Sequence, residues 1–215
     1  MSSTTATTTV RVLRAYKNDP ELRTRIIQEM EWHVEQDKIV RMTYGEECEN
    51  GDFRGCFMGC AIHSLARING IKLKTSRHQL GEDYLEIPVE IFHLADAVFE
   101  SLSVEKGKEF ALKFFPAIRT GADLSMVIPN FLYWTLTDDV KPTRYPKFQG
   151  FIDAVVALYE EWTRTGVKPP LTAYRADLAY RAYRADLAYL ADRAEKSAAK
   201  LLELLEQAPI LSKSA

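Results

Sequence analysis

The chain is organised around the sequence GCFMGCAIHS at residues 55–64. This stretch holds two of the three cysteines and one of the four histidines in the protein. Loop-forming residues with glycine precede it and an apolar run follows, a pattern typical of a loop that enters a helix near Cys56. Asn69-Gly70 is a good helix end. The sequence therefore predicts a helix over residues 56–69.

Residues three or four apart share one face of a helix. Four chemically distinctive side chains follow that spacing: Cys56, Cys60, His63 and Arg67. Arg67 is a candidate ligand-binding residue at the far end of this face. Three interpretations of the face stay open, namely a packed core, a metal site and a nucleophile.

The first interpretation is a packed core that requires no cofactor. Reduced cysteine is commonly buried and packs like a small apolar side chain. The neighbouring residues are also apolar: Phe57, Ala61, Ile62 and Leu65. The helix would then be buried nearly all round, with His63 as a hydrogen-bonded histidine in or beside the core.

The second interpretation is a zinc site formed by Cys56, Cys60 and His63. Thiolates and imidazoles bind zinc, and two of them one turn apart can reach the same ion. A fourth ligand would come from Cys48, His78 or water. The usual C-x-x-C spacing of structural zinc sites is missing.

The third interpretation is a cysteine-dependent hydrolase or acyl transferase with Cys56 as nucleophile. A cysteine in the first turn of a helix lies at the positive end of the helix dipole, which lowers its pKa. A histidine must act as base. The candidates are His63, His78 and His93, oriented by Asp96 or Asp83. We prefer His78, because residues 71–87 are expected to form a long connection with little regular structure.

The rest of the chain predicts an all-α protein, a helical bundle of about six helices. Apolar periodicity and helix caps place these helices at 20–42, 56–69, 88–101, 104–118, 123–137 and 147–165. Asp19 caps the first and Asp123 the fifth, where Asp123 is also a candidate ligand-binding residue because a helix start can hold an anion. Trp134 is a third candidate, on an aromatic-rich helix. Glu29 and His33 lie one turn apart on the first helix and could form a carboxylate–imidazole pair.

The C-terminal part has a different composition. AYRADLAYR at 173–181 is nearly repeated at 182–190, and no Gly or Pro occurs from there to Pro209. This predicts a long Ala-rich helix over 172–208. A heptad seam runs along it: Ala176, Tyr180, Tyr183, Leu187, Leu190, Ala194, Ser197, Leu201 and Leu204. Such a coiled-coil seam packs either on the body of the same chain or on a second copy.

Length and charge narrow the classes of function. A chain of 215 residues suits a disordered N-terminus at 1–9, a helical core domain at 10–168 and the helix at 172–208. Lys and Arg total 28 against 30 Asp and Glu, which argues against a nucleic-acid binder. No apolar run is long enough to cross a membrane. Three cysteines and no secretory signal favour a cytoplasmic location.

The segment from Gly55 to Trp134 resembles a family of small uncharacterised bacterial and phage proteins. The resemblance is carried by GCFMGCAIH at 55–63, His78, LEIP at 85–88, FESL at 99–102 and GADLS at 121–125. It implies a bacterial or phage setting, and a shared core that includes the Cys/His stretch, His78 and Asp123. It implies no particular activity.

The leading functional hypothesis is a non-enzymatic helical protein that acts by binding. It would be oligomeric through residues 172–208, with a protein partner or a small ligand as its target. The alternatives are the cysteine-dependent enzyme, with Cys56, His78, His63 and Asp96 as catalytic residues, and the zinc-binding module.

Overall fold

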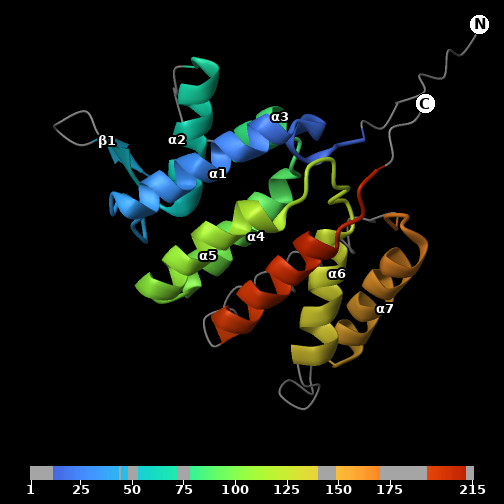
Figure 1. Ribbon diagram of the computed structural model, residues 1–215. Helices are drawn as coiled ribbons and strands as arrows, with labels where there is room; N and C mark the ends of the chain where they lie inside the picture. Colours follow the sequence, from blue (N-terminus) through green and yellow to red (C-terminus); the bar gives the residue numbers. More distant parts are fainter. Residues whose placement is uncertain are drawn as a thin grey trace, which may run out of the picture.

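The computed structural model describes residues 12–43, 45–47, 53–71, 78–139, 149–169 and 193–211. Its architecture is all-α, as predicted (Figure 1). The helices of the described part are α1 Pro20–Glu35, α2 Phe57–Asn69, α3 Gln79–Leu85, α4 Val89–Ser101, α5 Val104–Ala117, α6 Val127–Trp134 and α7 Gln149–Thr165. A further helical segment covers 193–207. In Figure 1, α2 and α6 run across the direction of α1 and α5.

A small antiparallel ribbon accompanies the helices. It consists of β1 Glu46–Glu47 and β2 Phe53–Arg54, with Glu46 opposite Arg54. Just after the ribbon, Gly55 forms a bridge with Ile39. The ribbon therefore fixes the backbone that leads into the GCFMGCAIHS stretch.

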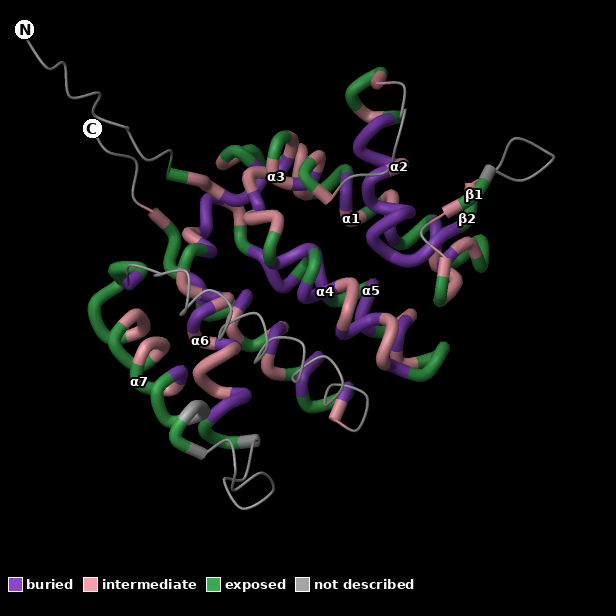
Figure 2. Tube along the Cα trace, turned by 180° about the vertical axis from the view of Figure 1, so that it is seen from behind, coloured by how far each residue is buried: buried purple, intermediate pink, exposed green. Residues whose placement is uncertain are grey.

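The core is built around phenylalanines. Phe57 at the start of α2 contacts Phe99, Phe110 and Phe114, with ring centroids 5.2 to 5.6 Å apart. Aromatic rings of this size bury a large apolar area. Figure 2 shows α2 mostly buried except at its C-terminal end, whereas α7 is mostly exposed or half-buried. The helix that opens with Cys56 and Phe57 is thus the central element of the fold.

Residues 71–87 were predicted to form a connection with little regular structure. This prediction is wrong for Gln79–Leu85, which form helix α3. A Cβ on Gly81 would lie 2.0 Å from the ring of Phe92, so this short helix packs directly on α4. Leu85 is fully buried. Seven residues are too few for a clear helical periodicity in sequence, and contacts with α2 and α4 stabilise the helix instead.

Two other predicted helices are shorter in the structure. α1 begins after Asp19, whose Oδ1 accepts hydrogen bonds from the backbone N–H groups of Glu21 and Leu22, as predicted. It ends at Glu35 rather than Met42, since Asp37 adopts a left-handed φ of 52°. α6 begins at Val127 rather than Asp123 and continues into a π-helical turn, η2 Thr135–Asp139. Helix ends were thus less predictable than helix existence.

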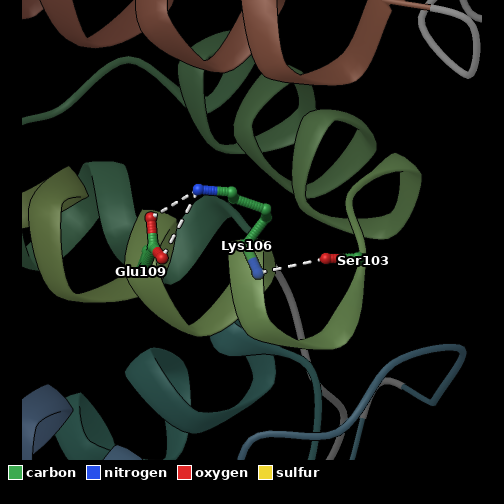
Figure 3. A network of polar contacts seen from close by, with 3 residues as sticks. All are labelled: Ser103, Lys106 and Glu109. Atoms are coloured by element: carbon green, nitrogen blue, oxygen red, sulfur yellow. Dashed lines mark hydrogen bonds and ion pairs between the residues drawn. The ribbon is translucent and has the colours of Figure 1, made fainter.

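The start of α5 is fixed by its own side chains (Figure 3). The Ser103 hydroxyl accepts a hydrogen bond from the Lys106 N–H at 3.3 Å. The Lys106 ammonium lies 3.2 Å from the Glu109 carboxylate. Serine caps the helix by accepting one of its unpaired N–H groups, which explains why α5 begins where the sequence predicts.

The segments near the two ends of the chain meet at one loop, through a set of backbone contacts that we call the clasp (residues 15, 121–123 and 209–211). Ala15 exchanges hydrogen bonds with Gly121 and Ala122 at 2.8 and 3.0 Å. On the other side, the Asp123 N–H donates to Pro209 at 2.8 Å and the Leu211 N–H donates to Gly121 at 3.2 Å. Gly121 has a φ of 75°, a conformation that favours glycine.

The helical segment at 193–207 packs on the body of its own chain. Ala194, Ser197, Leu201 and Leu205 are buried, and Leu204 is half-buried. The described part of the predicted seam is therefore covered from within the molecule. Residues 172–192 of the predicted long helix lie outside the described residues, as does the predicted disordered segment at 1–9.

Within the described ranges, no helix combines the length and the apolar character that crossing a membrane requires.

Candidate functional site

Cys56 lies at the point where the loop becomes helix α2. It is the N-cap residue, with extended backbone angles, and its Sγ accepts a hydrogen bond from the Gly59 N–H at 3.3 Å. The Cys56 N–H donates to the Thr43 carbonyl at 2.7 Å. The side chain is only 1% exposed. The sequence thus correctly placed Cys56 at a helix start, and the surrounding loop fixes the direction of its thiol.

Two carboxyl groups of α4 lie close to this thiol. Asp96 and Glu100 lie one helical turn apart and therefore face the same side of α4. The ligand atoms of Cys56, Asp96 and Glu100 all lie within 4.8 Å of one another. Among the residues that the structure describes, these three form the group of cysteine, histidine and acidic side chains with spacing suitable for one metal ion. We call this group the Cys56 cluster.

The loop before β1 holds Glu100 in place. The Met42 N–H donates to Glu100 Oε2 at 2.8 Å, and the Arg41 guanidinium donates to the Glu100 backbone carbonyl. Asp96 is held differently, because its Oδ1 is buried and accepts no hydrogen bond from any residue in the described ranges. A buried acceptor without a donor is unfavourable, so a cation at Oδ1 would stabilise it.

His78 lies on the other side of Asp96. Its Nε2 is 3.4 Å from Asp96 Oδ2, and its ring lies against that of His93, with centroids 4.3 Å apart. The structure thus brings together three of the four residues predicted as catalytic: Cys56, His78 and Asp96. Their order differs from that of a catalytic triad, because the carboxylate stands between the thiol and the imidazole.

The electrostatics of the cluster keep the Cys56 thiol protonated. Burial raises its pKa far above the ordinary value, and the nearby carboxylates of Asp96 and Glu100 raise it further. The Gly59 N–H lowers the pKa, but by less than burial raises it. Burial also raises the pKa of Glu100, with Asp96 adding to the effect. The Asp96 carboxylate therefore opposes ionisation of both Cys56 and Glu100.

The other predicted residues of the α2 face have different neighbours. They contact α1, Lys38 after it, and the segment 53–55 that precedes α2. Cys60 Sγ lies 3.6 Å from the Gly55 carbonyl and 3.7 Å from that of Lys38, and burial raises its pKa to about 12. His63 stacks on Phe53, with ring centroids 4.3 Å apart. Arg67 forms an ion pair with Glu29. The predicted combination of Cys56, Cys60 and His63 is therefore not the group that the structure brings to one point.

His33 forms a second polar cluster, beneath α2. Its Nε2 lies 3.0 Å from the Ser64 hydroxyl, and its ring centroid is 6.1 Å from that of His63. Burial, followed by the charge of His63, lowers the pKa of His33 to about 4. A neutral, buried histidine bonded to a buried serine is a packing contact between α1 and α2. The predicted carboxylate–imidazole pair of Glu29 and His33 forms no hydrogen bond among the described residues, because Glu29 pairs with Arg67 and His33 Nε2 bonds Ser64.

The remaining candidate ligand-binding residues, Asp123 and Trp134, make local contacts in the described part of the chain. Asp123 Oδ1 accepts a hydrogen bond from the Ser125 N–H at 3.0 Å, within the clasp loop. Trp134 packs against Phe131, with ring centroids 5.7 Å apart. Neither belongs to the Cys56 cluster. Glu100 does, although sequence reasoning missed it. The available signal was its position one turn after Asp96.

A scan against models of protein families found no match, and searches of curated proteins and of solved structures found no significant similarity. The resemblance carried by GCFMGCAIH and GADLS stays a prediction. What the Cys56 cluster does must therefore be inferred from its own chemistry.

Proposed function

We propose that this protein binds a divalent transition-metal ion, with zinc as the principal candidate, through Cys56, Asp96 and Glu100. The observation that carries the proposal is the convergence of these three ligand atoms within 4.8 Å of one another. Zinc accepts thiolate, imidazole and carboxylate ligands, usually in tetrahedral sites. A sulfur ligand makes magnesium or calcium poor candidates, because those ions prefer oxygen.

The charges of the cluster support a cation. Two carboxyl groups and a thiol lie close together in a mostly buried place, and the buried Oδ1 of Asp96 accepts no hydrogen bond from the described residues. A divalent ion would replace the Cys56 proton and offset the repulsion between the acidic groups. Because binding releases a proton from a thiol of raised pKa, zinc affinity should increase with pH across the neutral range.

The position of the cluster favours a structural or sensory role over catalysis. The ion would join the start of α2 to the middle of α4, two central helices of the core. Binding to the folded state alone would stabilise that state. A thiolate ligand must stay reduced, so a cytosolic location is part of this proposal.

The cysteine-dependent enzyme is less well supported. A nucleophilic cysteine needs a depressed pKa, whereas burial and two carboxylates raise that of Cys56. The charged groups that act on the thiol are the carboxylates of Asp96 and Glu100 rather than a histidine. The alternative makes a distinct prediction, since alkylation of Cys56 at neutral pH would favour it.

Self-association through residues 172–208 remains a second proposal, supported by fewer observations. The apolar face of 193–208 is covered by the same chain. An oligomer would therefore have to use residues 172–192, which lie outside the described residues. Light scattering of the purified protein separates a monomer from a dimer directly.

The test is a zinc titration of the metal-free protein by calorimetry, in reducing buffer. Wild type should bind about one zinc ion per chain, and Cys56→Ala and Asp96→Asn should each lose most of the affinity. Cys60→Ala is the matched control, because Cys60 lies one turn further along α2 and outside the cluster. Its affinity should equal that of wild type. Loss of binding in both Cys56→Ala and Cys60→Ala, with binding retained in Asp96→Asn, would instead support the predicted combination of Cys56, Cys60 and His63.

The titration needs a check on folding, which circular dichroism of each variant provides. Glu100→Gln is a further variant that keeps the shape of the side chain while removing its charge. Cobalt is a useful substitute, because a cobalt–thiolate bond gives a near-ultraviolet charge-transfer band. If folded wild type takes up no zinc and shows no such band with cobalt, the proposal is wrong.

A further inference from the structure

A cavity of about 340 Å³ lies between the start of α4, α6 and α7. Its lining is mostly apolar, with Ile128 and Pro129 from α6 and Val155, Leu158 and Trp162 from α7. The volume is at the lower end of the range for small-molecule sites. The Cys56 cluster contributes no residue to this lining, so the cavity is a separate feature of the molecule.

The α7 wall of the cavity is unusually apolar for a surface that the core does not cover. Among the described side chains of α7, Val155 is buried, whereas Leu158, Tyr159 and Trp162 are only half-buried. Tyr159 and Trp162 stack with centroids 6.1 Å apart and nearly parallel rings. This wall has an apolar area that a ligand would remove from water, which is favourable in proportion to the area covered.

Charge at the cavity is carried by two residues of its lining. The Lys168 ammonium lies 5.4 Å above the Trp162 ring, which keeps the cation at the aromatic wall. Glu90, in the first turn of α4, is the acidic residue of the lining. Both are exposed, so the charged part of a ligand would stay at the mouth and its apolar part would lie inside.

We infer that the cavity binds a small apolar molecule with a single carboxylate, of the size of a medium-chain fatty acid. The aliphatic and aromatic lining accommodates the chain, and the Lys168 ammonium beside Trp162 pairs with the carboxylate. Glu90 repels an anion, so the head group should lie at the Lys168 end. This inference is independent of metal binding.

The probe is decanoate, titrated by calorimetry below its micelle concentration, with decyl alcohol as the uncharged analogue. Wild type should bind decanoate with saturation at one site and bind the alcohol more weakly. Lys168→Ala should weaken decanoate binding about fivefold, the range of an exposed ion pair, and leave the alcohol unchanged. Lys113→Ala, an exposed lysine on α5, is the matched control and should behave as wild type.

A second pair of variants tests the location. Ile128→Trp and Leu158→Trp each fill the cavity from a half-buried position, on α6 and α7 respectively. Circular dichroism identifies which of the two variants are folded. At least one folded variant should lose binding of both decanoate and decyl alcohol. Failure of wild type to bind either probe would overturn the inference. So would binding that both filling variants retain, or an alcohol that binds as tightly as decanoate. The same titrations with a Cys56→Ala protein should give wild-type values.

Discussion

Nε2 of His78 lies 3.4 Å from Oδ2 of Asp96, joining the residue before α3 to the middle of α4. This contact places an imidazole beside one carboxylate oxygen of Asp96, whose other oxygen, Oδ1, is buried. Groups that orient a metal ligand are a regular part of metal sites. His78 would therefore act either as a fourth ligand or as the group that positions Asp96.

His78→Ala should weaken zinc binding about 10- to 100-fold without abolishing it, because three ligands remain. Calorimetry with a competing chelator measures the change. His93→Ala is the control, since His93 contacts the His78 ring but is itself exposed. Equal effects of the two variants would mean that ring stacking, rather than the contact with Asp96, is what matters.

The thiol of Cys56 should be unreactive in the folded, metal-free protein. Its raised pKa leaves little thiolate at neutral pH, and the side chain is buried. Iodoacetamide at pH 7 followed by peptide mass spectrometry should find no adduct at Cys56 or Cys60, and adducts at both after unfolding in guanidinium. Rapid modification of Cys56 in the native protein would revive the nucleophile hypothesis.

Protonation of His33 should destabilise the fold in mild acid. The pKa of His33 is about 4 in the folded protein and 6.5 when unfolded, so the unfolded chain binds more protons between these values. Stability is therefore fully present above pH 6.5 and falls toward pH 4, by up to about 3 kcal/mol. Urea unfolding at several pH values measures this slope.

A His33→Gln variant supplies the comparison, because it removes the titrating group from the α1–α2 contact. Its loss of stability between pH 6.5 and 4 should be smaller than that of wild type by most of the His33 contribution. Parallel curves for the two proteins would show that other groups, such as the carboxylates, account for the acid sensitivity.

Tyr16→Phe should lower stability by about 1 kcal/mol. The buried Tyr16 hydroxyl donates a 2.7 Å hydrogen bond to the Phe115 carbonyl at the end of α5. That carbonyl also accepts a bond from the Ile118 N–H, so it keeps a partner in the variant. Thermal unfolding measures the change. Tyr133→Phe, at a half-buried position, should have a smaller effect.

Alanine should have opposite effects at two helical glycines. In Gly81→Ala the new Cβ would lie 2.0 Å from the buried Phe92 ring, so we expect a loss of about 1 to 3 kcal/mol. At Gly150 in α7 a Cβ meets no atom within 4 Å, so Gly150→Ala should be neutral or stabilising by up to about 1 kcal/mol. Thermal unfolding of the two variants, compared with wild type, measures both changes. Stabilisation by Gly81→Ala would contradict the packing of α3 on α4.

Local sequence signals predicted much of the fold. Asp19-Pro20 and Asn69-Gly70 mark helix ends by chemistry that acts within one turn, and the corresponding helices start or stop there. The predicted end of α1 and start of α6 were wrong. Asp37 leaves the helical conformation just after α1, and the loop before α6 is held by a distant partner. The Asp123 N–H bonds Pro209, a residue no local pattern connects with it.

The candidate site was predicted only in part. Cys56, His78 and Asp96 were named as one possible set, yet sequence placed Cys56 on the same face as Cys60 and His63. As the N-cap residue, Cys56 has extended backbone angles, so helical spacing does not apply to it. Glu100 was missed because its role depends on how α4 lies against the start of α2, which is a property of tertiary packing.

The clasp has a consequence for how the chain folds during synthesis. Arg119, beside the clasp loop, donates to the Ala208 carbonyl, 89 residues further along. Domains begin to fold as they leave the ribosome, N-terminal segments first. The contacts of Ala15 with the loop can form early, but those with 209–211 must wait until these three residues have been synthesised. Synthesis of residues 209–211 would thus be the event that closes the clasp, and a nascent chain halted before Pro209 should remain sensitive to protease at the loop.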